Sequence, residues 1–171
     1  MKLLSTVGAE VEQRIGRQFP LLRQVVEKEG AVAMGRLAIS VFDHWLQESR
    51  EWHLMECHAG PERQARDEKF AAHWAAIFDL TPVYTVRYRG RWPTKARLVL
   101  KQYTDRAGYL ERCRVYPLRA PKQLIVLPAF DCIYASSWDD TNVLYFNHLA
   151  NAEPVVQLAR EAGLFVLDFS D

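Results

Sequence analysis

The sequence predicts an α+β domain in which N-terminal helices, about four of them, are followed by a mainly antiparallel sheet with a C-terminal β-α-β unit. Up to residue 80, apolar residues recur at intervals of three or four, as on one helix face, and from residue 83 they alternate with polar residues, as in strands. The chain has 171 residues, of which 49% are hydrophobic and 25% charged, as in one ordinary globular domain. We therefore expect a single domain over residues 1–171, with a helical part (1–80) and a sheet-rich part (83–171).

Four helices are expected in the helical part, over residues 5–18, 20–30, 32–58 and 61–80. Pro20 and Pro61 stand where helices begin, because proline fits the first turn, and Gly30 and Gly60 stand where helices end. Residues 32–58 form the longest periodic run, and further aromatic and aliphatic residues widen its apolar face. Such a wide face is typical of a central, largely buried helix.

Three strands are expected next, over residues 83–89, 96–103 and 109–116. In each of them apolar and polar residues alternate with a period of two, as on a strand with one buried face. Residues 90–94 and 104–108 carry glycine, proline, threonine or aspartate, which are typical of loops and turns. Such short connections join strands antiparallel, so the three strands form a predicted meander.

The remaining chain predicts more strands and one helix. The strands are expected over residues 123–127, 130–135, 142–146 and 164–169. Residues 151–162 fit a helix, with Pro154 tolerated in its first turn and Gly163 just past its end. A strand, a helix and a strand with short joints predict the β-α-β unit.

The net charge of +1 conceals a strong separation of charge along the chain. Residues 86–122 contain eleven basic and two acidic residues, a net charge of +9, whereas the rest of the chain contains eleven basic and nineteen acidic residues, a net charge of −8. In the predicted meander the basic residues share one strand parity, opposite to the main apolar set. We therefore expect one face of this meander to be strongly basic.

The predicted basic sheet face, within residues 84–122, combines cationic and aromatic side chains. Its candidate binding residues are Arg87, Arg89, Arg91, Trp92, Arg97, Lys101, Tyr103, Arg112, Arg114 and Tyr116. Guanidinium groups match phosphate oxygens, and flat rings can stack on bases. The expected function is therefore that of a small binding protein that contacts a nucleic-acid backbone.

Other interpretations of this charge pattern stay open. The basic face could be neutralised by acidic residues of the helical part, or it could bind an acidic protein surface, as an inhibitor or immunity-type partner does. No RNP, KH, helix-turn-helix or zinc-finger motif favours nucleic acid independently. A homo-oligomer is also open, because Trp45, Trp52 and Trp74 could face a core or a second subunit.

Patterns for catalysis and metal binding are sparse. His53 and Cys57 stand four residues apart and could share a metal ion on a helix, but this spacing is no known signature, and no cofactor is expected. Asp139 and Asp140, with Asp131 nearby, could hold Mg²⁺ in a hydrolase or nuclease, although Asp-Asp-Thr is also ordinary turn chemistry. No GxSxG, Walker or GxGxxG motif occurs. We expect a binding protein rather than an enzyme.

The three cysteines, Cys57, Cys113 and Cys132, bear on the compartment of the protein. They form an odd, widely spaced set without a CxxC pair, which predicts reduced thiols and a cytoplasmic location. No run approaches the ~18 uninterrupted apolar residues that a membrane span needs, so we expect no membrane association.

Overall fold

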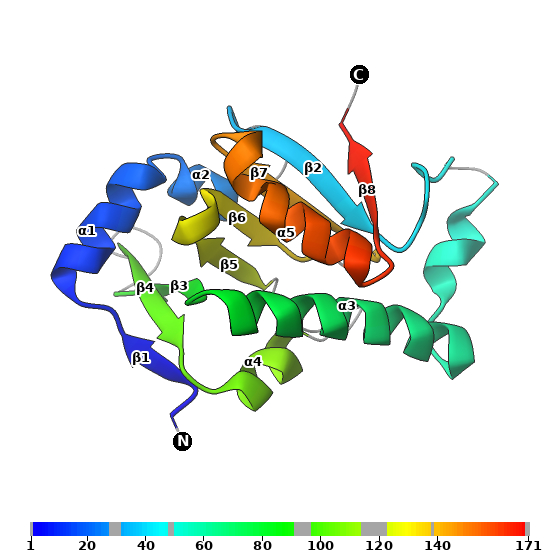
Figure 1. Ribbon diagram of the computed structural model, residues 1–171, viewed down its shortest axis with the longest axis horizontal. Coiled ribbons are helices and arrows are strands. Elements are labelled where there is room, and N and C mark those ends of the chain that lie inside the picture. Colours follow the sequence, from blue (N-terminus) through cyan, green and yellow to red (C-terminus); the bar gives the residue numbers. More distant parts are fainter. Residues whose placement is uncertain are drawn as a thin grey trace.

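The protein folds around one antiparallel sheet (Figure 1). The structure, a computed structural model, describes residues 2–27, 32–47, 50–90, 97–113, 123–137 and 139–169. Within these residues the sheet has eight strands, in the order β1-β4-β3-β5-β6-β7-β2-β8. The strands are β1 (Leu4–Thr6), β2 (Gly35–Ser40), β3 (Tyr84–Arg89), β4 (Arg97–Tyr103), β5 (Leu124–Leu127), β6 (Cys132–Ala135), β7 (Thr141–Phe146) and β8 (Phe165–Asp168). The predicted α+β class and the antiparallel sheet are confirmed.

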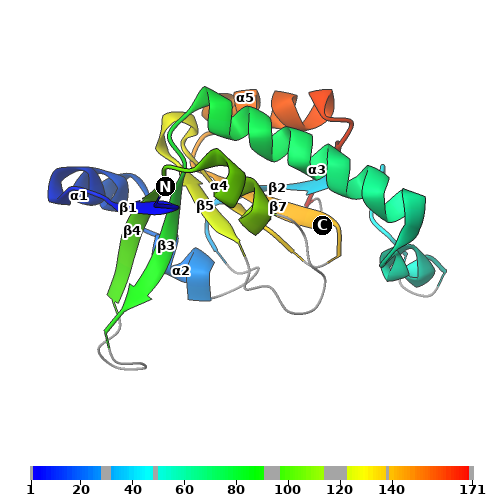
Figure 2. The ribbon, with the colours of Figure 1, turned by 90° about the horizontal axis from the view of Figure 1, so that it is seen from below.

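Helices cover both faces of the sheet. The helices are α1 (Ala9–Gln18), α2 (Leu22–Glu27), α3 (Gly60–Leu80), α4 (Arg106–Cys113) and α5 (Leu149–Glu161), with short 3-10 helices η1 (Trp52–Glu56) and η2 (Pro128–Phe130). Helices α3, α4 and α5 pack on one face, and α1 and α2 pack on the other (Figure 2). No described helix combines the length and the apolarity that crossing a membrane requires.

Two hydrophobic cores result, one on each face of the sheet. The core under α3 and α5 contains Trp74 and Tyr134, and the core under α1 and α2 contains Ile15 and Ile133. The neighbours Ile133 and Tyr134 enter different cores because successive side chains of a strand point to opposite faces. Strands covered on both faces read as nearly continuous apolar runs, as β5 and β6 do.

The long helix predicted over residues 32–58 is wrong. The described residues of this range hold strand β2 and the 3-10 helix η1 instead. Leu37 and Ile39 face one core, and all four residues from Leu37 to Ser40 are buried, so the segment has no polar face to reveal a period of two. A short apolar run that is buried on both sides has the same pattern in a strand and in a helix. Trp45 and Trp52 are exposed, at 45% and 58%, and add nothing to a core.

The third strand of the predicted meander, residues 109–116, is also wrong. Residues 106–113 form helix α4, and residues 114–116 lie outside the described part of the chain. Asp105 begins this helix, because its carboxylate accepts a hydrogen bond from the Gly108 amide at 3.2 Å and its carbonyl accepts one from Tyr109 at 2.9 Å. Tyr109 and Cys113, four residues apart, are the buried pair of the helix.

The order of helices and strands along the chain differs from the predicted one, in which all N-terminal helices precede the sheet. Strand β1 lies before α1 and pairs with β4, and β2 lies between α2 and α3 in the chain, so helices and strands are interleaved. The predicted C-terminal β-α-β unit also fails as a separate unit, because β7 and β8 are not neighbours. Strand β2 lies between them and pairs antiparallel with both. Strand β2, whose apolar pattern fits a helix as well as a strand, therefore joins β7 to β8 in the sheet.

His73 is the most deeply buried ionisable group of helix α3. Its side chain is 0% exposed, and its ring lies 5.6 Å from the ring of Trp74 and 5.5 Å from that of Tyr134. Burial disfavours the charged imidazolium and lowers the pKa of His73 to about 3. The folded protein therefore holds this histidine neutral at neutral pH.

We expect the stability of the protein to fall as the pH is lowered through the range in which an unfolded histidine titrates. In the unfolded chain His73 is protonated below about pH 6.5, whereas in the folded core it stays neutral down to about pH 3. Burying His73 in its neutral form therefore costs nothing above pH 6.5, and the folded state loses stability as the pH falls below that value. Between pH 7 and pH 5 this loss is about 2 kcal/mol. Urea unfolding of the wild type and of His73→Leu measures it, and the variant should show the smaller loss. Equal losses in the two proteins would contradict a buried, neutral His73.

Candidate anion-binding site

Four of the predicted binding residues lie on one face of a β-hairpin. Strands β3 and β4 pair so that Arg87 faces Val99, Arg89 faces Arg97 and Thr85 faces Lys101. Directly opposed residues of an antiparallel pair share a face, so Arg87, Arg89, Arg97 and Lys101 line the same side, which we call the basic hairpin face. Strand β5 pairs with β3 only at Tyr84 and Thr85, so the outer half of the hairpin extends beyond β5 (Figure 2).

The rest of the predicted basic sheet face is arranged differently. Arg112 lies in the last turn of helix α4 rather than on a strand. Tyr103 is 2% exposed, receives a hydrogen bond from the Gln123 amide and packs edge-on against Tyr109 at 5.0 Å between ring centroids. The Tyr103 ring is therefore part of the core and is not exposed to stack on a base. The other predicted residues, Arg91, Trp92, Arg114 and Tyr116, lie outside the described part of the chain.

A cavity of about 520 Å³ opens where β3 separates from β5. Its apolar lining residues are Val25, Val26, Val86, Leu124, Ala135 and Val143. Its polar and aromatic lining residues are Thr85, Gln123, Ser136, Ser137, Tyr88, Tyr145 and Phe169. Three arginines complete it, Arg36 from β2, Arg87 from β3 and Arg112 from α4, and no acidic residue is among the described lining residues. We call it the arginine-lined cavity.

The arginines of this cavity influence the buried tyrosine behind it. Burial raises the pKa of Tyr103, while the Gln123 hydrogen bond and the positive charges of Arg87 and Arg112 oppose that rise. Both guanidinium groups therefore act on the same part of the protein. Arg36 also stacks on Phe169, with its guanidinium carbon 4.7 Å from the ring centroid.

Basic residues of the 86–122 segment have few acidic partners within the described chain. Arg106 forms a bidentate pair with Asp79, with both distances 2.8 Å. Lys101 donates a hydrogen bond to the Thr6 hydroxyl at 2.9 Å. The other described basic residues of the segment, Arg87, Arg89, Arg97 and Arg112, form no ion pair with a described acidic residue. Neutralisation by the protein's own acids, one of the open interpretations, is thus seen at Arg106 but not at these four arginines.

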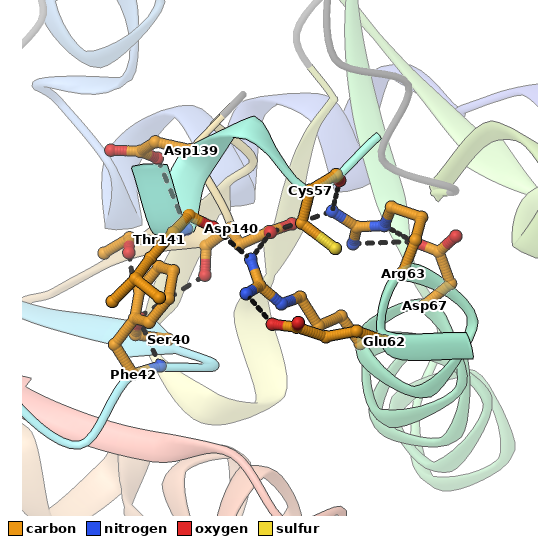
Figure 3. Close-up of polar contacts among 11 residues, drawn as sticks. Ser40, Phe42, Cys57, Glu62, Arg63, Asp67, Asp139, Asp140 and Thr141 are labelled. Carbon is orange, nitrogen blue, oxygen red and sulfur yellow. Dashed lines mark hydrogen bonds and ion pairs between the residues drawn. The ribbon is translucent and has the colours of Figure 1, made fainter. Parts of the chain in front are cut away.

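The predicted Mg²⁺ ligand Asp140 is engaged in a different way (Figure 3). Its carboxylate oxygen Oδ2 accepts hydrogen bonds from Arg63 Nη1 at 2.8 Å and from Arg66 Nη1 at 3.0 Å. Burial alone would lower the pKa of Arg63, but its hydrogen bonds to Asp140 and Asp67 more than offset this and raise that pKa. Two guanidinium groups therefore neutralise this carboxylate through Oδ2, while its other oxygen, Oδ1, is buried without a hydrogen-bond partner among the described residues.

The surroundings of Asp140 show a structural role for this turn. The backbone of Asp140 has a positive φ of 58°, which aspartate tolerates better than most residues. The Ser40 hydroxyl lies 2.8 Å from the Thr141 hydroxyl and accepts a hydrogen bond from the Phe42 amide at 3.1 Å. Asp139 accepts a hydrogen bond from the Thr141 amide at 3.3 Å, as in an ordinary Asx turn. The cluster therefore fastens helix α3 to the β2 and β7 ends of the sheet.

The remaining acidic and metal-binding candidates are also structural or dispersed. The carboxylate of Asp131 accepts hydrogen bonds from the side-chain amides of Gln18, Asn147 and Asn151, at 3.2, 2.7 and 3.4 Å. These bonds join the end of α1 to the start of α5. His53 is exposed and Cys57 half-buried, and no group of three or more potential metal ligands exists within the described residues.

Comparison with protein-family models, with curated proteins and with solved structures finds no match to this chain.

We expect Asp140→Asn to destabilise the protein strongly, because it removes the charge that the buried Arg66 and the partly buried Arg63 share. The asparagine tolerates the same positive φ, so the loss of charge is the main change. The free energy of unfolding should fall by on the order of 3 kcal/mol, measured by urea denaturation.

Asp67→Asn is the matched control for this experiment. Asp67 binds the same Arg63 at 2.8 Å, but its side chain is 42% exposed. Its loss should cost less than about 1 kcal/mol. Similar costs for the two variants would show that Asp140 is not the centre of the cluster.

Proposed function

We propose that this protein binds the phosphate backbone of nucleic acid through the basic hairpin face. The observation that carries the proposal is that Arg87, Arg89 and Arg97 form no ion pair with a described acidic residue, whereas several other described arginines do form ion pairs. Three like charges on one side of a two-stranded ribbon repel one another. An extended polyanion would relieve this repulsion and release its own counterions.

The form of the hairpin supports a nucleic acid in particular. Its two strands are about 5 Å apart, and a two-stranded ribbon is narrow enough to enter the major groove, about 12 Å wide. The guanidinium forks of arginine match phosphate oxygens with two parallel hydrogen bonds. The exposed ring of Tyr88 belongs to the opposite parity of β3, so the basic side chains rather than the ring define the face.

An acidic protein surface is the alternative partner. Tyr88 is 41% exposed on the same hairpin, and an exposed aromatic beside arginines is typical of protein interfaces. In either case we propose a non-catalytic, cytoplasmic protein. The three free cysteines, Cys57, Cys113 and Cys132, support the cytoplasmic location. A stoichiometric protein partner that co-purifies without nucleic acid would favour the inhibitor or immunity-type alternative.

We expect the protein to bind labelled duplex DNA, single-stranded DNA and RNA in a fluorescence-anisotropy titration, with an affinity that falls as salt increases. In Arg89→Glu/Arg97→Glu, affinity should drop about tenfold or more, and the slope of log K against log salt should flatten by about 2, because two phosphate contacts are lost.

The charge-matched control is Arg50→Glu/Arg160→Glu, which changes two exposed arginines outside the hairpin by the same total charge. This control should retain most of the affinity. Absence of binding at low salt, or an equal loss in both double variants, would overturn the proposed function.

A further inference from the structure

The arginine-lined cavity gathers basic side chains beside the basic hairpin face. Arg36, Arg87 and Arg112 reach it from three different elements, and the described lining contains no carboxylate. Arg87 and Arg112 form no ion pair with a described acid. Positive groups gathered around a partly enclosed space favour an anion there, because the interaction is screened less than at an open surface.

The apolar lining limits what the anion can be. Val86, Leu124 and Val143 present aliphatic surface to the same cavity. Inorganic phosphate could satisfy the arginines but would leave this surface and most of the 520 Å³ in contact with water. A cavity of this volume falls in the range that takes a whole small molecule. A ligand that matches this lining would have an anionic end and a larger, partly apolar body.

The polar lining residues favour a ligand whose body also carries heteroatoms. The Gln123 amide nitrogen is committed to Tyr103, which leaves its side-chain carbonyl available as an acceptor. The Thr85 hydroxyl donates to the Leu124 carbonyl at 2.8 Å and can still accept a hydrogen bond. Ser137 brings a further hydroxyl to the lining. A fatty acid would cover these groups without satisfying them, which is costly.

We propose that the arginine-lined cavity binds a nucleoside phosphate, with the phosphate at Arg87 and Arg112 and the nucleoside against the wall formed by Val86, Leu124 and Val143. This chemistry has two sources, a free nucleotide and the terminal residue of a nucleic-acid strand. This site differs from the basic hairpin face, to which the proposed function is assigned. Of the four residues of that face, only Arg87 also lines the cavity.

The test is a calorimetric titration with AMP, GMP, CMP and UMP, with the matching nucleosides and with inorganic phosphate. At least one monophosphate should bind about tenfold or more tightly than its nucleoside and than phosphate, because both halves of the cavity contribute. Oligonucleotides with and without a 5′-phosphate then identify the source. Preference for a 5′-phosphorylated strand over the monophosphate indicates a strand end, and the reverse indicates a free nucleotide.

Two variants address the cavity and one addresses the hairpin. Arg112→Gln removes one cavity charge, and Ala135→Phe fills the cavity beside Val143 without changing charge. Each should weaken nucleotide binding about tenfold, whereas Arg89→Glu/Arg97→Glu should leave it within about twofold. Thermal unfolding checks that Ala135→Phe is folded, and Arg112→Gln tests the site if it is not.

The outcomes separate the two proposals. Monophosphates that bind no more tightly than phosphate, or that bind Arg112→Gln as well as wild type, would overturn the cavity site even if long nucleic acids bind the hairpin. Nucleotide binding by a wild-type protein that binds no long nucleic acid at low salt would support the cavity and overturn the proposed function.

Discussion

Strands β5, β6 and β7 are buried on both faces, and the placement of the other elements depends on this two-sided burial. Neither face of these strands can be left in water, so α3 and α5 pack on one side and α1 and α2 on the other. The outer half of the β3–β4 hairpin extends beyond this covered part of the sheet, because β5 pairs with β3 only at Tyr84 and Thr85. Charged side chains can stay solvated there, and a cavity remains where the two strands separate.

Burial also determines whether an arginine needs an acidic partner, as the Asp140 cluster and the β3–β4 hairpin show. At the α3 end of the sheet, Arg63 and Arg66 lie in protein surroundings and share the buried carboxylate of Asp140. A buried guanidinium without such a partner would be strongly destabilising. Around the hairpin, Arg89 and Arg97 are exposed, so water can solvate them and no acidic partner is needed for folding. Their charge is left available for a ligand, which is the physical basis of the proposed function.

The arginine-lined cavity depends on contacts between segments that are far apart in the chain. Arg36 comes from β2, Arg87 from β3 and Arg112 from α4. Arg87 and Arg112 could be selected from the sequence because both lie in the basic segment. Arg36 could not be selected, because the sequence pattern predicted a helix where strand β2 lies. Gln123, which links the cavity to Tyr103, carries no sequence signal for such a role. The same holds for Arg63 and Arg66, whose acidic partner lies more than 70 residues away.

The sequence by itself determined the α+β class, the separation of charge and the strand parity of Arg87, Arg89, Arg97 and Lys101, because composition and a period of two are local properties. Only the tertiary structure decided that residues 35–40 form a strand and residues 106–113 a helix. The first choice depends on burial by both β7 and β8 and the second on packing of Tyr109 against Tyr103 and Phe78, and a local pattern contains neither contact. Packing against Tyr109 also buries Tyr103, and a separate contact between α3 and the turn before β7 sets Asp140 between Arg63 and Arg66.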